Sequence, residues 1–304
     1  MDQAFVHQPV MVTEVVDVLG HTGPGVLIDA TVGGGGHSAA LVEANPALRV
    51  IGLDRDPAAV AAATGRLGDR AVILHARFDR MAELVTDGPV VAILFDLGVS
   101  SPQLDRSERG FSYRHPGPLD MRMDPGQGLT AADVVNTYDE RSLASLFREN
   151  GEGRFAGRIA RAVVGARPVE DTETLAAVIK DAIPAPARRR GGHPATRVFQ
   201  AIRIEVNGEL SVLRPALEAA MELLAPGGRL AVLTYHSGED RIVKDALRTA
   251  TTGGCTCPPG LPCVCGAVAS FRWAVRAKTP GPNELTVNPR AQSARLRAVE
   301  RISP

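Results

Sequence analysis

Short apolar runs alternate with helical stretches from residue 25 to residue 96. The apolar runs, suited to buried strands, are 25–28, 49–53, 71–75 and 90–95. Between them, helical patterns begin at Ser38 and span Pro57–Leu67. Strands that alternate with helices in this way predict a parallel sheet covered by helices.

The alternation stops after Asp96 and resumes with a predicted helix at 209–224, a turn at 225–228 and a strand at 229–233. The intervening chain is rich in glycine and arginine at first and mainly helical from 131 to 182. Residues 295–302 alternate polar and apolar, as in a half-exposed final strand. This strand could pair in antiparallel with the rest of the sheet. We therefore predict an α/β core made of 1–106 and 207–304, interrupted by a helical domain at 107–206.

The loop after the first predicted strand contains four successive glycines, followed by His37. Glycines there let the backbone approach a ligand and adopt positive φ angles. Asp54 ends the next strand, where a carboxylate can accept hydrogen bonds from both hydroxyls of a ribose. Together the loop and Asp54 predict a nucleotide-like cofactor.

The spacing of the glycines bears on which cofactor this is. A dinucleotide loop needs a third glycine where Ser38 stands, so the hydride-transfer interpretation is weakened. S-adenosylmethionine has no pyrophosphate, and its loops add an acidic residue at the strand end, here Asp29. S-adenosylmethionine is the favoured ligand; another nucleotide, or a tight turn without a ligand, are the alternatives.

Composition narrows the class of protein. The 304 residues are 44% hydrophobic, enough for a large core, and contain no long apolar segment or basic leader. We expect a cytoplasmic protein that does not enter a membrane. The net charge is zero, yet 141–214 holds thirteen Lys or Arg against eight Asp or Glu. Arg154, Arg158 and Arg161 have the spacing of one helix face, which either binds phosphates or is simply solvated.

Longer stretches of the chain resemble one family, the bacterial 16S ribosomal RNA cytosine-N4 methyltransferases. They are 29–37, 54–57, 96–105, 109–112, 117–123, 193–197, 199–201, 235–237 and 239–241. The resemblance runs nearly end to end. It implies a class I S-adenosylmethionine-dependent (Rossmann-like) methyltransferase core with an inserted helical domain. It also implies 16S rRNA, in the small ribosomal subunit, as partner, and methylation of the N4 amine of a decoding-centre (P-site) cytidine.

The cofactor residues expected from the loop and the resemblance are Gly34, Gly35, Gly36, His37, Asp54, Phe78, Asp96 and Gln103. For Phe78 the alternative is a core phenylalanine, and for His37 a helix-start residue that satisfies a local carbonyl. The residues considered for the substrate are Phe111, Tyr113, Asp120, Arg122, Arg154, Arg158, Arg197 and His236. Phe111 and Tyr113 form either a stacking platform for an extruded base or two anchors of a long loop.

Asp96 ends the fourth predicted strand, where it could accept a hydrogen bond from the cytosine amine and orient its lone pair. The following Ser100-Ser101-Pro102 resembles in position the turn of amino-group methyltransferases, but lacks the aromatic residue. One alternative is therefore that Asp96 only binds the cofactor. Asp120 and the His236 loop are then the competing candidates for the proton acceptor.

All four cysteines lie within eleven residues, as Cys255, Cys257, Cys263 and Cys265. Four thiolates in a short loop suit structural zinc, although each C-x-C arm is tighter than usual. Reduced thiols on a surface loop are the alternative, and we expect no metal in catalysis. The rival functions are a nicotinamide-dependent oxidoreductase and an RNA-binding or ribosome-assembly module. The sequence does not decide between monomer and homodimer.

Overall fold

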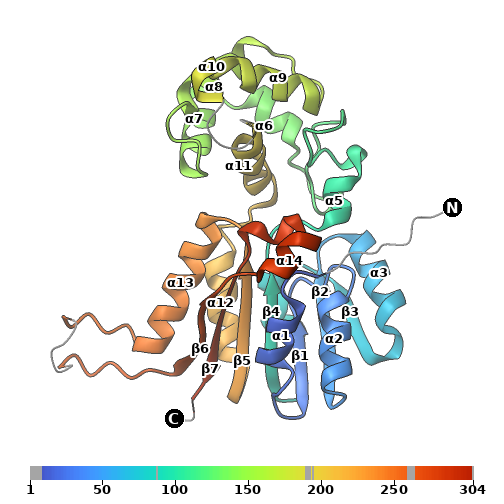
Figure 1. The fold of residues 1–304 in the computed structure, drawn as a ribbon, viewed down its shortest axis with the longest axis vertical. Coiled ribbons are helices and arrows are strands. Elements are labelled where there is room, and N and C mark those ends of the chain that lie inside the picture. The colour runs from blue at the N-terminus through green and yellow to red at the C-terminus, as the bar shows by residue number, and fades with distance from the viewer. Residues whose placement is uncertain (1–8, 87, 189–192, 194, 259–263, 303–304) are drawn as a thin grey trace. The chain divides into compact units, whose positions relative to one another are not determined.

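A computed structural model describes residues 9–86, 88–188, 193, 195–258 and 264–302. The chain divides into two compact units, Met1–Gly98 with Leu210–Pro304, and Val99–Glu209 (Figure 1). The second unit begins earlier than the predicted residue 107, because Val99 and Leu104 pack against its core.

The described residues of the first unit form a seven-stranded sheet of order β3-β2-β1-β4-β5-β7-β6. The strands are β1 (Gly25–Asp29), β2 (Leu48–Asp54), β3 (Ala71–His75), β4 (Val90–Asp96), β5 (Leu224–Thr234), β6 (Phe271–Lys278) and β7 (Arg295–Arg301). Strands β1 to β5 pair in parallel, and β7 is antiparallel to both its neighbours. The predicted α/β class is confirmed.

Helices cover both faces of this sheet (Figure 1). One face carries α1 (Val12–Leu19), α2 (Gly36–Ala44) and α3 (Pro57–Leu67), and the other carries α4 (Met81–Leu84), α12 (Leu213–Leu223) and α13 (Ser237–Thr252). The remaining helical segments are η1 (Gly68–Arg70), η2 (Phe78–Arg80), α14 (Pro282–Val287) and η4 (Pro289–Ser293). Successive strand side chains alternate between two cores: Leu94 joins one, while Ile93 and Phe95 join the other. Burial on both faces explains the continuous apolar runs in the sequence.

The second unit is mainly helical and has a core of its own. Its elements are α5 (Ser101–Asp105), η3 (Ser107–Arg109), α6 (Ala131–Thr137), α7 (Glu140–Glu149), α8 (Ala156–Gly165), α9 (Thr172–Ala182), α10 (Ala185–Arg188) and α11 (Ala195–Asn207). The buried Asn207 ties the loop before α6 to α11, since its side chain binds the backbone of Met121 and Met123 at 2.8 and 2.9 Å. Among the described helices, none has the length and apolarity needed to cross a bilayer.

Two sequence expectations about the last strands were wrong. The predicted turn at 225–228 lies inside β5: Leu224 pairs with Val90 and Arg229 with Ala92, so the extra residues form a bulge. The final strand β7 is not half-exposed, because the four successive residues 296–299 are buried, and the unpredicted edge strand β6 makes it internal to the sheet. Its Arg297 is buried and forms an ion pair with Asp240 at 2.8 Å. An alternation of polar and apolar residues cannot reveal that an arginine is buried.

Candidate active site

The glycine loop joins β1 to α2 at the carboxyl edge of the sheet. Gly33 and Gly35 have φ angles of 52° and 74°, in the left-handed region that favours glycine. A Cβ on Gly33 would meet only the Thr31 carbonyl oxygen, at 3.9 Å, whereas one on Gly35 would lie 3.2 Å from Leu67 of α3. A Cβ on Gly36 would clash with the ring of Pro9.

The glycines therefore serve two purposes. Gly35 and Gly36 are required by packing within the protein itself, against α3 and against the segment before α1. Gly33 and Gly34 are partly exposed, so this half of the turn offers its backbone to a ligand. The cofactor contacts expected from the sequence were Gly34, Gly35 and Gly36, and Gly33 was not among them.

Asp54, at the end of β2, holds the loop in place. Its Oδ2 accepts a hydrogen bond from the Gly33 N–H at 2.9 Å, and its Oδ1 accepts one from the Asp56 N–H at 2.8 Å. Burial raises the pKa of Asp54 to about 6, an effect that these two hydrogen bonds offset in part and that the charges of Asp56 and Asp29 enhance. Each carboxylate oxygen retains a second lone pair, so two further donors can be accommodated.

Asp29, which the sequence analysis assigned to a cofactor loop, is only 1% exposed. Its carboxylate accepts a 2.6 Å hydrogen bond from the Ser38 hydroxyl and a 3.3 Å bond from the Thr31 N–H. Burial raises its pKa, against the opposing effects of Ser38 and His37. Asp29 thus braces β1 against α2 from inside the protein.

Asp96, at the end of β4, accepts hydrogen bonds from its surroundings and remains partly exposed. Its Oδ1 accepts a 2.6 Å hydrogen bond from the Tyr235 hydroxyl, and its Oδ2 lies 3.5 Å from His37 Nδ1. The Asp96 N–H donates to Thr31 Oγ1 at 2.6 Å, which joins β4 to the glycine loop. The side chain is 20% exposed, so a reactant can reach it.

His37 lies at the start of α2 and is 6% exposed. Its Nε2 donates to the carbonyl oxygen of Val10 at 2.8 Å. The alternative considered from the sequence was a hydrogen bond to a carbonyl group nearby in the chain. The acceptor is instead distant in the sequence. The His37 Nδ1 faces Asp96, and it can donate to that carboxylate only when both ring nitrogens carry a proton.

Tyr235 is the residue of this site that sequence reasoning missed. Burial raises its pKa well above 10, and the negative charge of Asp96 and the hydrogen bond to it act in the same direction. The hydroxyl therefore stays protonated and serves as a permanent donor to Asp96. One signal could have found it: Tyr235 directly follows β5, the parallel neighbour of β4, so their carboxyl ends meet at one edge.

Phe78 begins η2 after β3 and is half-buried. Its ring packs edge-on against Phe95, with centroids 5.5 Å apart and planes at 72°. Phe78 thus makes the core contact that was the alternative to an adenine contact. The residue is only half-buried, so it also remains accessible to a ligand.

Gln103 and Asp120 lie in the second unit. The Gln103 amide oxygen accepts a 3.0 Å hydrogen bond from the Ser100 N–H and so caps α5. Asp120 binds the Arg122 guanidinium through both oxygens, at 3.0 and 2.7 Å, and Arg122 also binds the carbonyl oxygens of Pro125 and Gln127. Burial opposes ionisation of Asp120, but the bonds from Arg122 outweigh it and lower its pKa. A carboxylate held in this way is a poor proton acceptor.

His236, proposed from the sequence as a substrate residue or acceptor, is the N-cap of α13. Its Nδ1 accepts hydrogen bonds from the N–H groups of Gly238 and Glu239 at 3.2 and 3.4 Å. Its Nε2 is buried, 3.1 Å from the carboxylate of Glu239. Because Nδ1 already accepts hydrogen bonds at the helix terminus, His236 is less well placed than Asp96 to accept a proton.

The aromatic residues of the second unit separate into an anchor and an exposed pair. Phe111 is 6% exposed and belongs to the core of that unit, so it anchors the loop and offers no stacking face. Tyr113 stacks on His193, with centroids 4.5 Å apart and planes at 16°, and both rings are partly exposed. The Tyr113 hydroxyl lies 2.9 Å from Thr196 Oγ1. His193 was not among the expected site residues, although it lies in a stretch quoted for the family resemblance.

The expected arginine face of α8 is smaller than predicted. Arg154 lies in the turn before the helix and stacks over Phe155, because α8 begins only at Ala156. Arg158 and Arg161 are exposed on α8, and Arg161 pairs with Glu140 at 3.1 Å.

Arg197, on α11, is exposed and donates to the Gly151 carbonyl oxygen at 3.4 Å. It lies 3.9 Å from Glu152. Its charge is thus only loosely engaged within the second unit.

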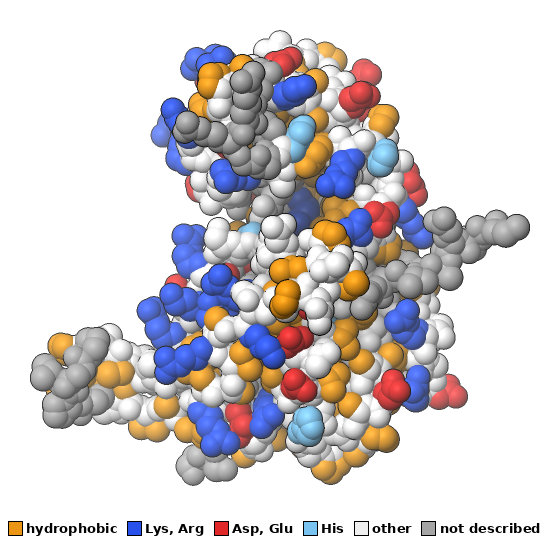
Figure 2. Space-filling view, viewed as in Figure 1, with side chains coloured by type: hydrophobic (Ala, Val, Ile, Leu, Met, Phe, Trp, Pro, Cys, Tyr) orange, Lys and Arg blue, Asp and Glu red, His pale blue; other side chains and the backbone are white. Residues whose placement is uncertain are grey.

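A second basic surface lies on the first unit, where the sequence gave no hint of one. Figure 2 shows Lys and Arg side chains gathered over α13 and the neighbouring strand β6. The exposed basic residues of these elements are Arg241, Lys244, Arg248, Arg272, Arg276 and Lys278, of which Arg248, Arg272 and Lys278 pair with Asp245, Glu300 and Glu14. The helix residues recur at intervals of three and four, so they share one face of α13.

The family model described as the MraW methylase family matches residues 4–302. The chain is 52% identical to "Ribosomal RNA small subunit methyltransferase H" of Mycolicibacterium gilvum, over 97% of this chain and 83% of that protein. It is 49% identical to the protein of the same name from Heliobacterium modesticaldum, over 98% and 99%. A crystal structure of an rRNA methylase from Streptococcus thermophilus aligns with 99% of this chain and 100% of its own at a TM-score of 0.43 and 13% identity.

Proposed function

The chain belongs to the MraW methylase family, and from this premise we propose that it uses S-adenosylmethionine to methylate the N4 amine of a decoding-centre (P-site) cytidine in 16S rRNA. Methyl transfer is the chemistry of the family. The relatives' printed name, ribosomal RNA small subunit methyltransferase, supports rRNA of the small subunit as the acceptor. The observation that carries the proposal in this structure is the arrangement of Gly33, Asp54 and Asp96 along one sheet edge.

The residues at this edge fit S-adenosylmethionine. The open side of the glycine turn at Gly33 suits the methionine end, and the spare lone pairs of Asp54 suit the two ribose hydroxyls. The exposed part of Phe78, two strands from the glycine loop, suits the adenine. When bound, the cofactor supplies an electrophilic methyl group on a sulfonium.

Asp96 is the best-placed proton acceptor. A cytosine amine that forms a bond to the methyl carbon must release one proton, while the electrons of the broken bond go to sulfur. Of the three acceptors proposed from the sequence, Asp120 is held by Arg122 and His236 caps a helix, whereas Asp96 is partly exposed and oriented by the Tyr235 hydroxyl. Asp96 would accept a hydrogen bond from the amine and then its proton.

The partly exposed Tyr113, stacked on His193, supports recognition of an extruded base by the second unit. A cytidine in folded RNA must leave its stack before its amine can reach a methyl donor. Aromatic faces stabilise such unstacked bases. The basic surface on α13 and β6 suits the phosphates of the surrounding RNA.

The proposal is tested by incubating small subunits that lack the modification, and their free RNA, with labelled S-adenosylmethionine. We expect label on one cytidine of 16S rRNA, as N4-methylcytidine. Label on carbon 5 or on another base would overturn the assignment of the amine, and absence of transfer to either substrate would overturn the function.

Cofactor affinity should depend on pH through Asp54. Its folded pKa of about 6 exceeds the ordinary value of 3.8, so in the unliganded protein the carboxyl takes up a proton as the pH falls through 6. Ribose hydroxyls bind the ionised form better, so lowering the pH from 7.5 to 5 should weaken binding about tenfold. Titration calorimetry in buffers of different ionisation enthalpy should show proton release on binding near pH 6. A pH profile that persists in Asp54→Ala would assign the effect to another group.

The stacked pair of Tyr113 and His193 in the second unit gives a separate prediction. Tyr113→Ala should weaken binding of the small-subunit RNA by about 5- to 150-fold, the usual cost of losing one stacked base. Tyr113→Phe keeps the ring and loses only the contact with Thr196, so it should bind nearly as well as the wild type. Filter binding with S-adenosylhomocysteine present measures both. Equal losses in the two variants would show that the hydroxyl, and not stacking, matters.

A further inference from the structure

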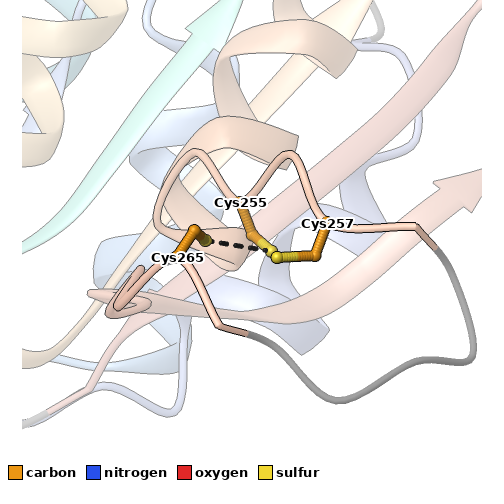
Figure 3. A group of neighbouring side chains, drawn as sticks. All are labelled: Cys255, Cys257 and Cys265. Atoms are coloured by element: carbon orange, nitrogen blue, oxygen red, sulfur yellow. Dashed lines mark hydrogen bonds between the residues drawn. The ribbon is translucent and has the colours of Figure 1, made fainter.

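We propose that Cys255, Cys257 and Cys265 bind a structural zinc ion that fixes the loop between α13 and β6. The three sulfur atoms lie within 4.8 Å of one another. Figure 3 shows their side chains pointing toward a common centre from the two arms of this loop. Cys263, the fourth cysteine of the sequence, lies outside the described residues, and the proposal uses only these three thiols.

The separations match coordination better than a disulfide. Zinc–sulfur bonds of about 2.3 Å in a tetrahedron place sulfur atoms about 3.8 Å apart. The Cys265 Sγ lies 3.5 Å from the Cys255 Sγ, well beyond the roughly 2.05 Å of a disulfide bond. Thiolates in a tetrahedral arrangement favour zinc among common metals.

Neither apolar burial nor regular secondary structure stabilises the described parts of this loop. In the described parts, 253–258 and 264–270, no residue is buried and none belongs to a helix or strand. Val264 and Val268 are 89% and 83% exposed, so apolar burial contributes little. A segment that cannot form a core is commonly stabilised by a metal or disulfide.

The backbone at the base of the loop brings the arms together. The Ser270 N–H donates to the Ala250 carbonyl oxygen at 3.2 Å, which joins the start of β6 to α13. Gly253 has a φ of 61°, and a Cβ there would clash with the backbone of Val268. Cys255 and Cys257 follow this base on one arm and Cys265 precedes it on the other, so the thiols are collected before any metal binds.

The test is metal analysis of the full-length protein, purified without chelator from zinc-supplemented cells. We expect about one zinc per chain in the wild type and in the control Thr256→Ser. The double variant Cys255→Ser/Cys265→Ser should retain only trace zinc. Its binding of S-adenosylhomocysteine should be unchanged, which shows that the protein is folded.

A second measurement on the wild type does not depend on the variant's folding. After removal of zinc, added Co²⁺ should give an intense thiolate-to-cobalt charge-transfer band in the near ultraviolet. Protease should also cut between α13 and β6 faster in the metal-free protein. A wild type with only trace zinc and no such cobalt band, or a disulfide among these cysteines under reducing purification, would overturn the proposal.

Discussion

Asp96→Asn is expected to lower kcat for methyl transfer about a thousandfold, because the substitution removes a positioned proton acceptor. The asparagine oxygen can still accept a hydrogen bond from the Tyr235 hydroxyl. The hydrogen bond from the residue 96 N–H to Thr31 does not involve the side chain. The loop should therefore keep its shape, and the dissociation constant of S-adenosylmethionine should change little. Single-turnover kinetics with labelled cofactor, beside calorimetric binding, separates the two quantities.

Tyr235→Phe is the matched control for this variant. It removes the 2.6 Å hydrogen bond to Asp96 but leaves the carboxylate, so kcat should fall only about tenfold, the equivalent of one hydrogen bond to a charged group. If Asp96 serves the cofactor alone, the result reverses: Asp96→Asn would weaken S-adenosylmethionine binding and spare the single-turnover rate. That outcome would contradict the acceptor role and leave the cofactor role standing.

Elements that carry their own local signals could be predicted from the sequence. Helix α3 has the predicted bounds, because the Asp56 side chain caps it, Pro57 fixes its first turn and Gly68 follows its last residue. Strand β3 was also placed correctly. The bulge in β5 was misread because a Pro-Gly-Gly sequence marks a reversal more often than an irregular strand.

Long-range contacts account for what the sequence could not reveal about the site. The Tyr235 and Asp96 side chains are 139 residues apart and meet only through the pairing of β4 and β5. Conversely, His236 was a candidate because it lies in a stretch that resembles the family, yet its Nδ1 completes a helix terminus. Chemistry-bearing residues can be found from sequence, but whether their lone pairs are already used depends on backbone positions.

Asp54→Ala is expected to weaken S-adenosylmethionine binding roughly 150-fold, about 3 kcal/mol for the loss of two hydrogen bonds to a charged group. The effect should be seen in the dissociation constant, because the proposed partner of Asp54 is the ribose and not the reacting atoms. Replacement also deprives the Gly33 and Asp56 N–H groups of their acceptor. Part of the loss could therefore arise from the loop rather than from the ribose.

A control variant and an altered ligand separate these causes. Asp56→Ala removes the N-cap of α3, whose Oδ1 accepts from the Ala58 N–H at 3.0 Å, and should cost about 1 kcal/mol of folding stability while cofactor binding is retained. The 2′,3′-dideoxy analogue of S-adenosylhomocysteine should bind weakly to the wild type. In Asp54→Ala it should bind as well as the parent ligand, because the partner of the hydroxyls is already gone. Losses that simply add in this double cycle would exclude a contact between Asp54 and the ribose, and would assign the effect of the substitution to the glycine loop.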